Sequence, residues 1–114
     1  ETAPNFDPIY FAFDSSEFRA GTEDTLQTMA EYLLKNSKVT ITIGGHSDER
    51  GTAEYNLALA ERRARKAQDF LAHLGVPADR MSSTSYGEER PAAEGHGEEV
   101  WSKNRRDEFQ VGSK

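Results

Sequence analysis

The residues best suited to do chemistry are concentrated between residues 44 and 67, in the stretch GGHSDERGTAEYNLALAERRARKA. After its first two glycines come four side chains that can bind ions or transfer protons: His46, Asp48, Glu49 and Arg50. They follow an apolar alternating run and precede a helical pattern, which is where α/β sheets commonly hold ligands. The stretch therefore predicts a binding or catalytic loop. The alternative is a polar loop in which Asp48 or Thr52 caps the helix.

A basic group lies further along the same stretch and consists of Arg62, Arg63, Arg65 and Lys66. Taken alone, such a group is typical of a solvated helix face. Arg63 lies about 15 Å of helical rise beyond the helix start. It can therefore meet Asp48 only if a loop folds back over the helix.

The pattern His46-x-Asp48 suggests a metal, but the other histidines, His73 and His96, fall in a helix and in a glycine-rich loop. A catalytic zinc needs three protein ligands, and no HExxH or comparable spacing is present. Ser47 and His46 are neighbours in the sequence, which does not by itself make a catalytic triad. The sequence contains no G-x-S-x-G nucleophile elbow, no P-loop and no dinucleotide-binding fingerprint. We expect neither a metal nor a cofactor.

Composition narrows the function classes further. The chain has 114 residues, 14 Lys+Arg, 20 Asp+Glu and no cysteine, which excludes thiol catalysis, disulfides and cysteine-ligated zinc. Residues 1–57 hold 10 acids and 4 bases, a net charge of -6, whereas residues 58–114 hold 10 of each. A nucleic-acid partner is therefore not expected, because phosphate binding needs a basic face. No apolar run approaches the roughly 20 residues that span a bilayer.

Hydrophobic periodicity predicts the elements that position these residues. The expected elements are a strand over 9–13, a helix over 22–36 capped by Thr22, a strand over 39–43, a helix over 57–74, a weaker strand over 81–86, a short helix near 98–101 and an edge-like strand near 109–111. This order predicts an α/β (α+β) two-layer sandwich, with a mixed sheet of about four strands and two main helices on one face. Residues 1–7 are expected to be the end of a flexible linker, and residues 8–114 one domain.

The run GHSDERGTAEYNLALAERRA resembles the signature of the outer-membrane-protein-A-like peptidoglycan-binding domains, a G-H-x-D-x-x-G loop followed by N-x-x-L and an R-A pair. The resemblance covers nearly the whole chain: IYFAFDSSEF is similar to the family's first strand and loop, SYGEERPAAEGH to its third strand and next loop, and SKNRR to its late helix. The run DERGT followed by EYN is similar to the lipid-anchored members of this family.

The resemblance implies non-catalytic binding of the peptidoglycan stem peptide at its diaminopimelate residue. By position, Asp48 corresponds to the family's ligand-binding aspartate and Arg63 to its arginine. An anionic Asp48 suits an ammonium, and the planar guanidinium of Arg63 suits a carboxylate. Backbone N–H groups of Asp14, Ser15 and Ser16 are expected to form a carboxylate nest. Replacement of Arg63 by Ala is expected to leave the fold intact and to weaken binding by about 2–5 kcal/mol.

Further positions follow from the same resemblance. Asn56 is expected to organise the loop and Leu59 to pack on the ligand's aliphatic chain, although both also suit a helix that packs on a sheet. The run 104–106 is expected to tie the late helix to the sheet. The sequence departs from the family at Ser16, where lipid-anchored members tend to have an aromatic residue, and at 107–108, where the family is usually more apolar.

The resemblance also implies a biological setting. It is the periplasmic side of the outer membrane, with a lipid anchor upstream of residue 1 and the periplasmic β-propeller protein of the Tol system as partner. The alternatives are a wall-binding domain of another outer-membrane or motor protein, and a partner-docking domain that has lost wall binding. A wall hydrolase using His46, Asp48 and Glu49 is disfavoured by the ligand count.

Overall fold

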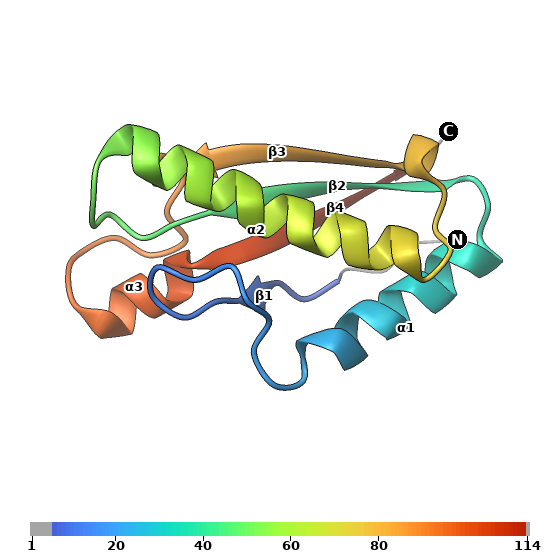
Figure 1. The fold of residues 1–114 in the computed structure, drawn as a ribbon, viewed down its shortest axis with the longest axis horizontal. Helices are drawn as coiled ribbons and strands as arrows, with labels where there is room; N and C mark the ends of the chain where they lie inside the picture. The colour runs from blue at the N-terminus through green and yellow to red at the C-terminus, as the bar shows by residue number, and fades with distance from the viewer. Residues whose placement is uncertain (1–5, 114) are drawn as a thin grey trace.

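The computed structural model describes residues 6–113 and forms two layers, a four-stranded sheet and two long helices (Figure 1). The predicted linker end at 1–7 lies largely outside the described residues. The elements are β1 (Ile9–Tyr10), α1 (Thr22–Lys35), β2 (Val39–His46), α2 (Ala53–His73), a 3-10 turn η1 (Ala78–Arg80), β3 (Met81–Gly87), α3 (Glu98–Asn104) and β4 (Arg106–Ser113).

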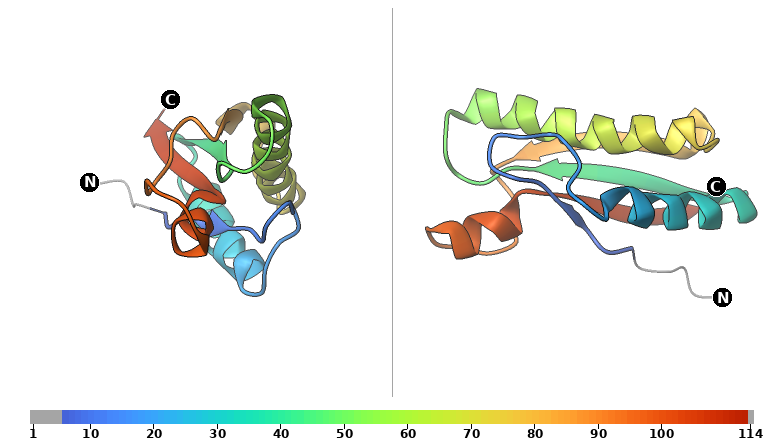
Figure 2. Two further views of the ribbon diagram at one scale, coloured as in Figure 1. Left: turned by 90° about the vertical axis from the view of Figure 1, so that its left-hand side faces the viewer. Right: turned by 60° about the horizontal axis from the view of Figure 1, so that its bottom comes forward.

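The sheet has the strand order β1-β4-β2-β3, with β2 parallel to β3 and β4 antiparallel to both β1 and β2. Both long helices cover the same face of this sheet, and α3 lies beyond its end (Figure 2). The predicted fold class and element order are confirmed.

Two strand predictions were wrong in detail. The strand expected over 9–13 ends at Tyr10, because arginine side chains take the carbonyls that follow: Arg105 Nε donates to Phe11 O at 2.8 Å and Arg63 Nη2 to Ala12 O at 3.1 Å. The last strand, expected to be edge-like, lies between β1 and β2 and begins at Arg106.

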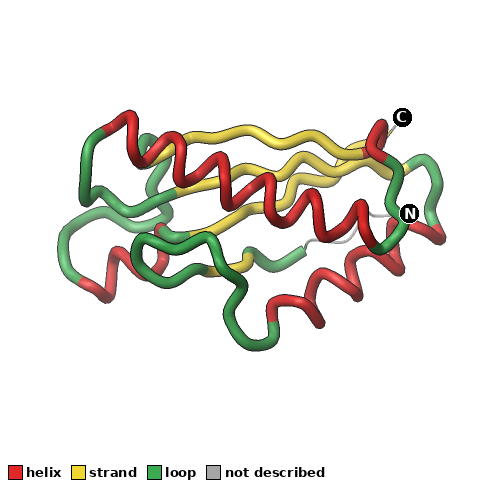
Figure 3. Tube along the Cα trace, viewed as in Figure 1, coloured by secondary structure: helices red, strands yellow, loops and turns green. Residues whose placement is uncertain are grey.

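The helix boundaries follow local chemistry. Thr22 is the first residue of α1 rather than its cap, since the N-cap position belongs to Gly21, which has a φ of 88°. At α2 the hydroxyl oxygen of Thr52 accepts from the backbone N–H of Tyr55 at 3.1 Å, so Thr52 is the cap. Figure 3 shows α2 running the length of the sheet and ending in the turn before β3.

The core lies between the helices and the sheet. Its buried side chains come from one stripe of each long helix, from the inward face of the strands and from two loop positions, Phe11 and Val76. They are Ile9, Phe11, Leu26, Met29, Ala30, Leu33, Ile41, Ile43, Ala64, Ala67, Leu71, Val76, Met81 and Phe109. Small residues on α2 allow close contact at Gly45, where an added Cβ would lie 1.9 Å from Ala60 O and 3.3 Å from the Ala64 Cβ. This contact fixes α2 directly over the strand that leads into the predicted site.

Within the described residues, no helix is long and apolar enough to cross a membrane.

Candidate functional site

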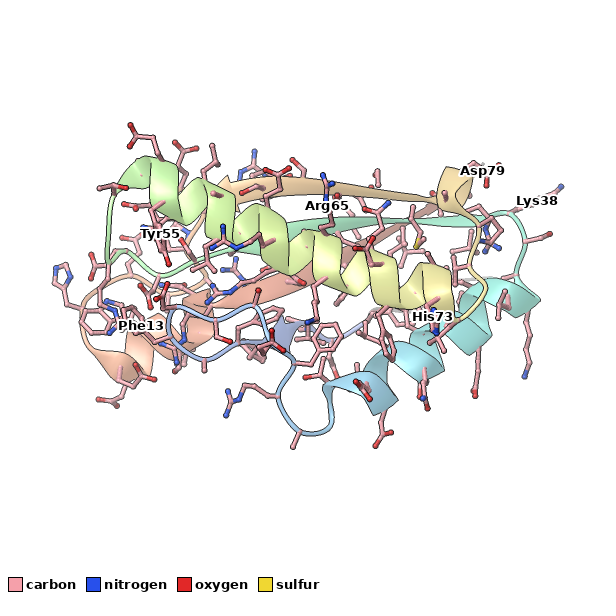
Figure 4. All side chains as sticks on the ribbon, viewed as in Figure 1. Phe13, Lys38, Tyr55, Arg65, His73 and Asp79 are labelled. Carbon is pink, nitrogen blue, oxygen red and sulfur yellow. The ribbon has the colours of Figure 1, made fainter. Side chains whose placement is uncertain are left out.

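A cavity of about 160 Å³ lies at the end of the sheet where β2 runs into α2, and the loop between β1 and α1 folds over it. Phe13 and Tyr55 mark this end of the molecule, whereas Lys38, His73 and Asp79 lie at the other (Figure 4). Its lining residues are Phe13, Asp14, Ser47, Asp48, Arg50, Gly51, Tyr55, Asn56, Leu59 and Arg63. Arg63 of α2 and Asp48 of the β2–α2 loop therefore line one cavity, which sequence spacing alone could not establish.

Arg63 is fully buried, with 0% of its surface exposed. Its Nε donates to Ser15 O at 2.8 Å, its Nη1 to His46 O at 2.9 Å, and its Nη2 to Ala12 O at 3.1 Å. Burial lowers the pKa of this guanidinium to about 10, so the group stays charged at neutral pH. Because a guanidinium has five N–H donors, two remain for a ligand. Because Arg63 makes these three bonds, we expect Arg63→Ala to lower stability as well as to weaken binding, in contrast to the expectation from the sequence alone.

Asp48 is 4% exposed and its carboxylate is already engaged. Its Oδ1 accepts from the backbone N–H of Arg50 at 3.0 Å, and its Oδ2 accepts from Arg50 Nη2 at 2.7 Å and from Arg105 Nη1 at 3.5 Å. Burial alone would raise the pKa of Asp48, but the bonds from Arg50 outweigh it and hold the pKa below its ordinary value. An incoming ammonium must therefore share Asp48 with Arg50 or displace it.

Arg50 is held between two aromatic rings. Its guanidinium carbon lies 3.7 Å from the ring centroid of Phe13 and 4.0 Å from that of Trp101. Such cation–π contacts orient a planar guanidinium, in this case toward the Asp48 carboxylate. Arg50 therefore joins the β1–α1 loop, the β2–α2 loop and α3 at the mouth of the cavity.

The β1–α1 loop is fastened at Asp14, which has a φ of 56° and accepts a hydrogen bond from the Tyr55 hydroxyl. Of the three residues expected to form a carboxylate nest, only Asp14 lines the cavity. The N–H of Ser15 donates to Ala12 O at 3.3 Å, and its carbonyl faces Arg63. Ser15 thus accepts from the site arginine rather than offering a donor, and Ser16 is not among the lining residues.

Asn56 and Leu59 both line the cavity, one helical turn apart on α2. The amide of Asn56 donates to Glu88 Oε1 at 2.6 Å and so connects α2 to the loop after β3. Leu59 is 5% exposed and gives the cavity an apolar wall.

The run 104–106 fastens α3 and its neighbouring loop. Asn104 Oδ1 accepts from the N–H groups of Ala92 and Ala93 at 2.7 and 3.0 Å, and Arg105 donates to both carboxylate oxygens of Glu98, at 3.1 and 2.7 Å. These bonds fasten α3 and the loop before it; the expected link to the sheet is the bond from Arg106 of β4, whose Nη1 donates to Asn104 O at 3.2 Å. Arg105 also touches Asp48 from outside the cavity, a link that the sequence analysis missed.

His46 does not share a site with Asp48. Its ring lies on the sheet face away from the helices, where it stacks on Tyr86 with the centroids 5.2 Å apart. Within residues 6–113, no group of three His, Asp or Glu side chains is arranged to hold a metal ion.

The buried position of His46 predicts an acid-sensitive fold. Burial, followed by the positive charge of Arg106, lowers the pKa of His46 from 6.5 to about 4. Between these values the unfolded chain binds a proton that the folded chain does not, so stability falls as pH drops through this window. We expect His46 to account for a loss of about 2 kcal/mol, with part of the full shift screened by solvent.

Urea unfolding of the wild type and of His46→Phe at several pH values in this window measures the effect. The Phe variant keeps a ring against Tyr86 and should lack this part of the acid slope, whereas Tyr86→Phe should retain it. Equal slopes for the wild type and His46→Phe would show that His46 is not the titrating group.

The stack of Phe13, Arg50 and Trp101 was not predicted from the sequence, although Arg50 itself was named as a candidate site residue. The available sequence signal was an aromatic residue on each side of the charged motif, Phe13 before it and Trp101 after it. Phe13 is 54% exposed even though one face of its ring packs on Arg50.

These features define an α+β domain with a small charged cavity at one end of its sheet. Residues 10–105 match the model of the OmpA family. The chain belongs to this family.

Among curated proteins, the peptidoglycan-associated lipoprotein of Brucella melitensis is 52% identical over 100 residues, which cover 88% of this chain and 60% of that protein. The chain therefore spans about three fifths of the length of that relative. A solved structure of the peptidoglycan-associated lipoprotein from Burkholderia pseudomallei superposes with a TM-score of 0.90 at 41% identity, covering 92% of this chain and 89% of that one. The C-terminal domain of Helicobacter pylori MotB gives a TM-score of 0.86 at 25% identity, covering 95% and 85%.

Proposed function

We propose that this domain binds peptidoglycan without catalysis, and that it recognises the diaminopimelate residue of the stem peptide in the cavity at the end of β2. The observation that carries the proposal is that one cavity contains the buried cation Arg63, the buried anion Asp48 and the apolar wall of Leu59. The names of the relatives from Brucella melitensis and Burkholderia pseudomallei, both peptidoglycan-associated, support the same class of ligand.

The chemistry of diaminopimelate fits these groups one by one. Its carboxylate suits the two N–H donors of Arg63 that no backbone carbonyl takes, as a charge-assisted pair. Its ammonium suits Asp48, and its aliphatic chain suits Leu59. A lysine residue at the same place in the stem peptide lacks the second carboxylate, so Arg63 would give selectivity between the two.

A non-catalytic role fits the electrostatics of the cavity. A general acid near neutral pH needs a raised pKa. The pKa of Asp48 is instead lowered, and its oxygens are occupied by arginine donors. Such a carboxylate is suited to holding a cation.

In the whole protein we infer a tether between the outer membrane and the wall, acting on the periplasmic side through an upstream lipid anchor. The β-propeller protein of the Tol system is the proposed protein partner, with a contact surface that overlaps the peptide cavity. Wall binding and partner binding then exclude each other.

Calorimetric titration with a soluble diaminopimelate-containing muropeptide, and with a lysine-containing one as control, tests the proposal. Selective binding of the first is expected. Absence of binding to either would remove wall recognition and leave the propeller protein as the next ligand to titrate.

Asp48→Asn should weaken ligands that carry a free diaminopimelate ammonium and spare those in which this nitrogen is part of an amide. The reason is that an amide nitrogen has no charge for Asp48 to compensate. We expect a loss of about 1.5–3 kcal/mol for the free form, the range of hydrogen bonds to charged groups. Calorimetry with the two muropeptides measures it. An equal loss for both would mean that Asp48 only maintains the loop by holding Arg50.

A further inference from the structure

Asp107 is the buried charged group that the proposed site leaves unexplained. It is 0% exposed, and within the described residues neither of its carboxylate oxygens has a hydrogen-bond partner. Burial of a carboxylate without partners is costly, so such a group needs a physical reason.

The strand register places Asp107 beneath the site. In β4 it pairs with Gly45 of β2 on one side and with Ile9 of β1 on the other. Paired residues point to the same sheet face, and at Gly45 this face meets the Ala60–Ala64 turn of α2. Arg63 belongs to this turn, so the guanidinium of Arg63 and the carboxyl group of Asp107 lie in the same layer between sheet and helix.

The charged groups facing this layer come from four segments. Arg63 lies on α2, Asp48 in the β2–α2 loop and Asp14 in the β1–α1 loop, and Arg105 is the residue just before β4. The charges of Asp48, Asp14, Arg105 and Asp107 all influence the pKa of the Arg63 guanidinium. For Asp107 itself, burial raises the pKa well above its ordinary value, and the attraction of Arg63 opposes this rise. The ionisation of Asp107 therefore depends on its electrostatic attraction to Arg63, which weakens when another anion binds Arg63.

We propose that Asp107 is a positioning residue of the binding site, an internal counter-charge whose ionisation competes with a ligand carboxylate for Arg63. The competition arises because one cation cannot fully stabilise two anions. A carboxylate ligand on Arg63 disfavours ionised Asp107, and ionised Asp107 disfavours the ligand. This inference rests on the proposed function.

Two measurable consequences follow. Ligand affinity should fall as pH rises through the titration of Asp107, and binding in that range should take up a proton. We expect an affinity loss of about tenfold, the change that corresponds to one pKa unit of coupling. Because a neutral residue cannot titrate, Asp107→Asn should show a flat affinity profile and no proton uptake.

Calorimetric titration with the diaminopimelate-containing muropeptide from about pH 5 to about pH 8, in buffers of different ionisation enthalpy, measures both quantities. Asp107→Val is a second variant that should behave like Asp107→Asn if the amide perturbs folding. Glu108→Gln is the matched control, since it removes one negative charge from the neighbouring residue, which is exposed on the other sheet face. It should retain the wild-type profile.

The outcomes separate this inference from the proposed function. Loss of pH dependence and of proton uptake in both Asp107 variants, but not in Glu108→Gln, supports the positioning role. Tight binding with the same profile in all four proteins overturns it and leaves the proposed function standing. Absence of binding by the wild type at every pH overturns both.

Discussion

Arg63→Ala is expected to lower the free energy of unfolding by about 3–5 kcal/mol, the range seen when one partner of a buried charged interaction is removed. The variant removes the side-chain donor of three backbone carbonyls, those of Ala12, Ser15 and His46, of which Ala12 O keeps the backbone N–H of Ser15. Two of them belong to the β1–α1 loop, so this loop should lose part of its attachment to α2 and the wall it gives to the cavity should loosen, although the bond between Asp14 and Tyr55 remains. Urea unfolding at neutral pH measures the loss.

Arg65→Ala is the matched control on the same helix. Its guanidinium is exposed and, within residues 6–113, donates to Glu61 alone, one turn away, at 3.3 Å. Removal of such a surface pair changes stability by less than about 1 kcal/mol. Similar losses for the two variants would show that the carbonyl bonds of Arg63 do not hold the loop.

Arg63→Lys separates the structural role from the binding role. A lysine keeps the positive charge, but its single ammonium cannot reach three carbonyls and also present a planar pair of donors to a carboxylate. We expect this variant to fold under conditions where Arg63→Ala does not, and to bind the muropeptide far more weakly than wild type. Wild-type affinity in Arg63→Lys would mean that the charge alone recognises the ligand.

The fold was predictable because its information is local. Alternation at 39–43 and helical periodicity on both helices identified the two layers, and the predicted end of α1 near Asn36 is confirmed. The central position of β4 was not predictable, because it depends on which strands pair across the sheet. The pairing of β1 with β4, at Ile9 with Asp107 and at Tyr10 with Arg106, joins the two ends of the chain and leaves no local pattern in the sequence near Phe109.

Only the site residues that belong to the sequence motif could be predicted. Asp48 and Arg63 were identified by their resemblance to family positions, and the structure places both in one cavity. The stack of Phe13, Arg50 and Trp101 joins three segments that are far apart in the sequence, so it exists only after folding. The same holds for Asp107, whose lack of a partner is a property of packing.

Gly45→Ala should lower the free energy of unfolding by about 3 kcal/mol, the upper part of the range for overpacked interiors. The added Cβ would lie 1.9 Å from Ala60 O, a backbone atom of α2 that cannot move without shifting the helix. The same shift displaces Arg63 from the carbonyls it binds. Stability and ligand binding should therefore decline together, as unfolding and calorimetry can measure.

Gly44→Ala is a control of the same chemistry one residue earlier, on the other sheet face. Its Cβ would meet the Tyr86 ring at 3.0 Å, a side chain that can move, and no part of α2. We expect a smaller loss of stability and unchanged muropeptide affinity. If Gly44→Ala abolished binding as completely as Gly45→Ala, the close approach of α2 to β2 would not be what positions Arg63. If only Gly45→Ala abolished binding, a glycine at this position would be a structural requirement of the binding site. The reason is that the lack of a side chain at Gly45 lets the Arg63 turn of α2 lie directly above Asp107 and beside Asp48.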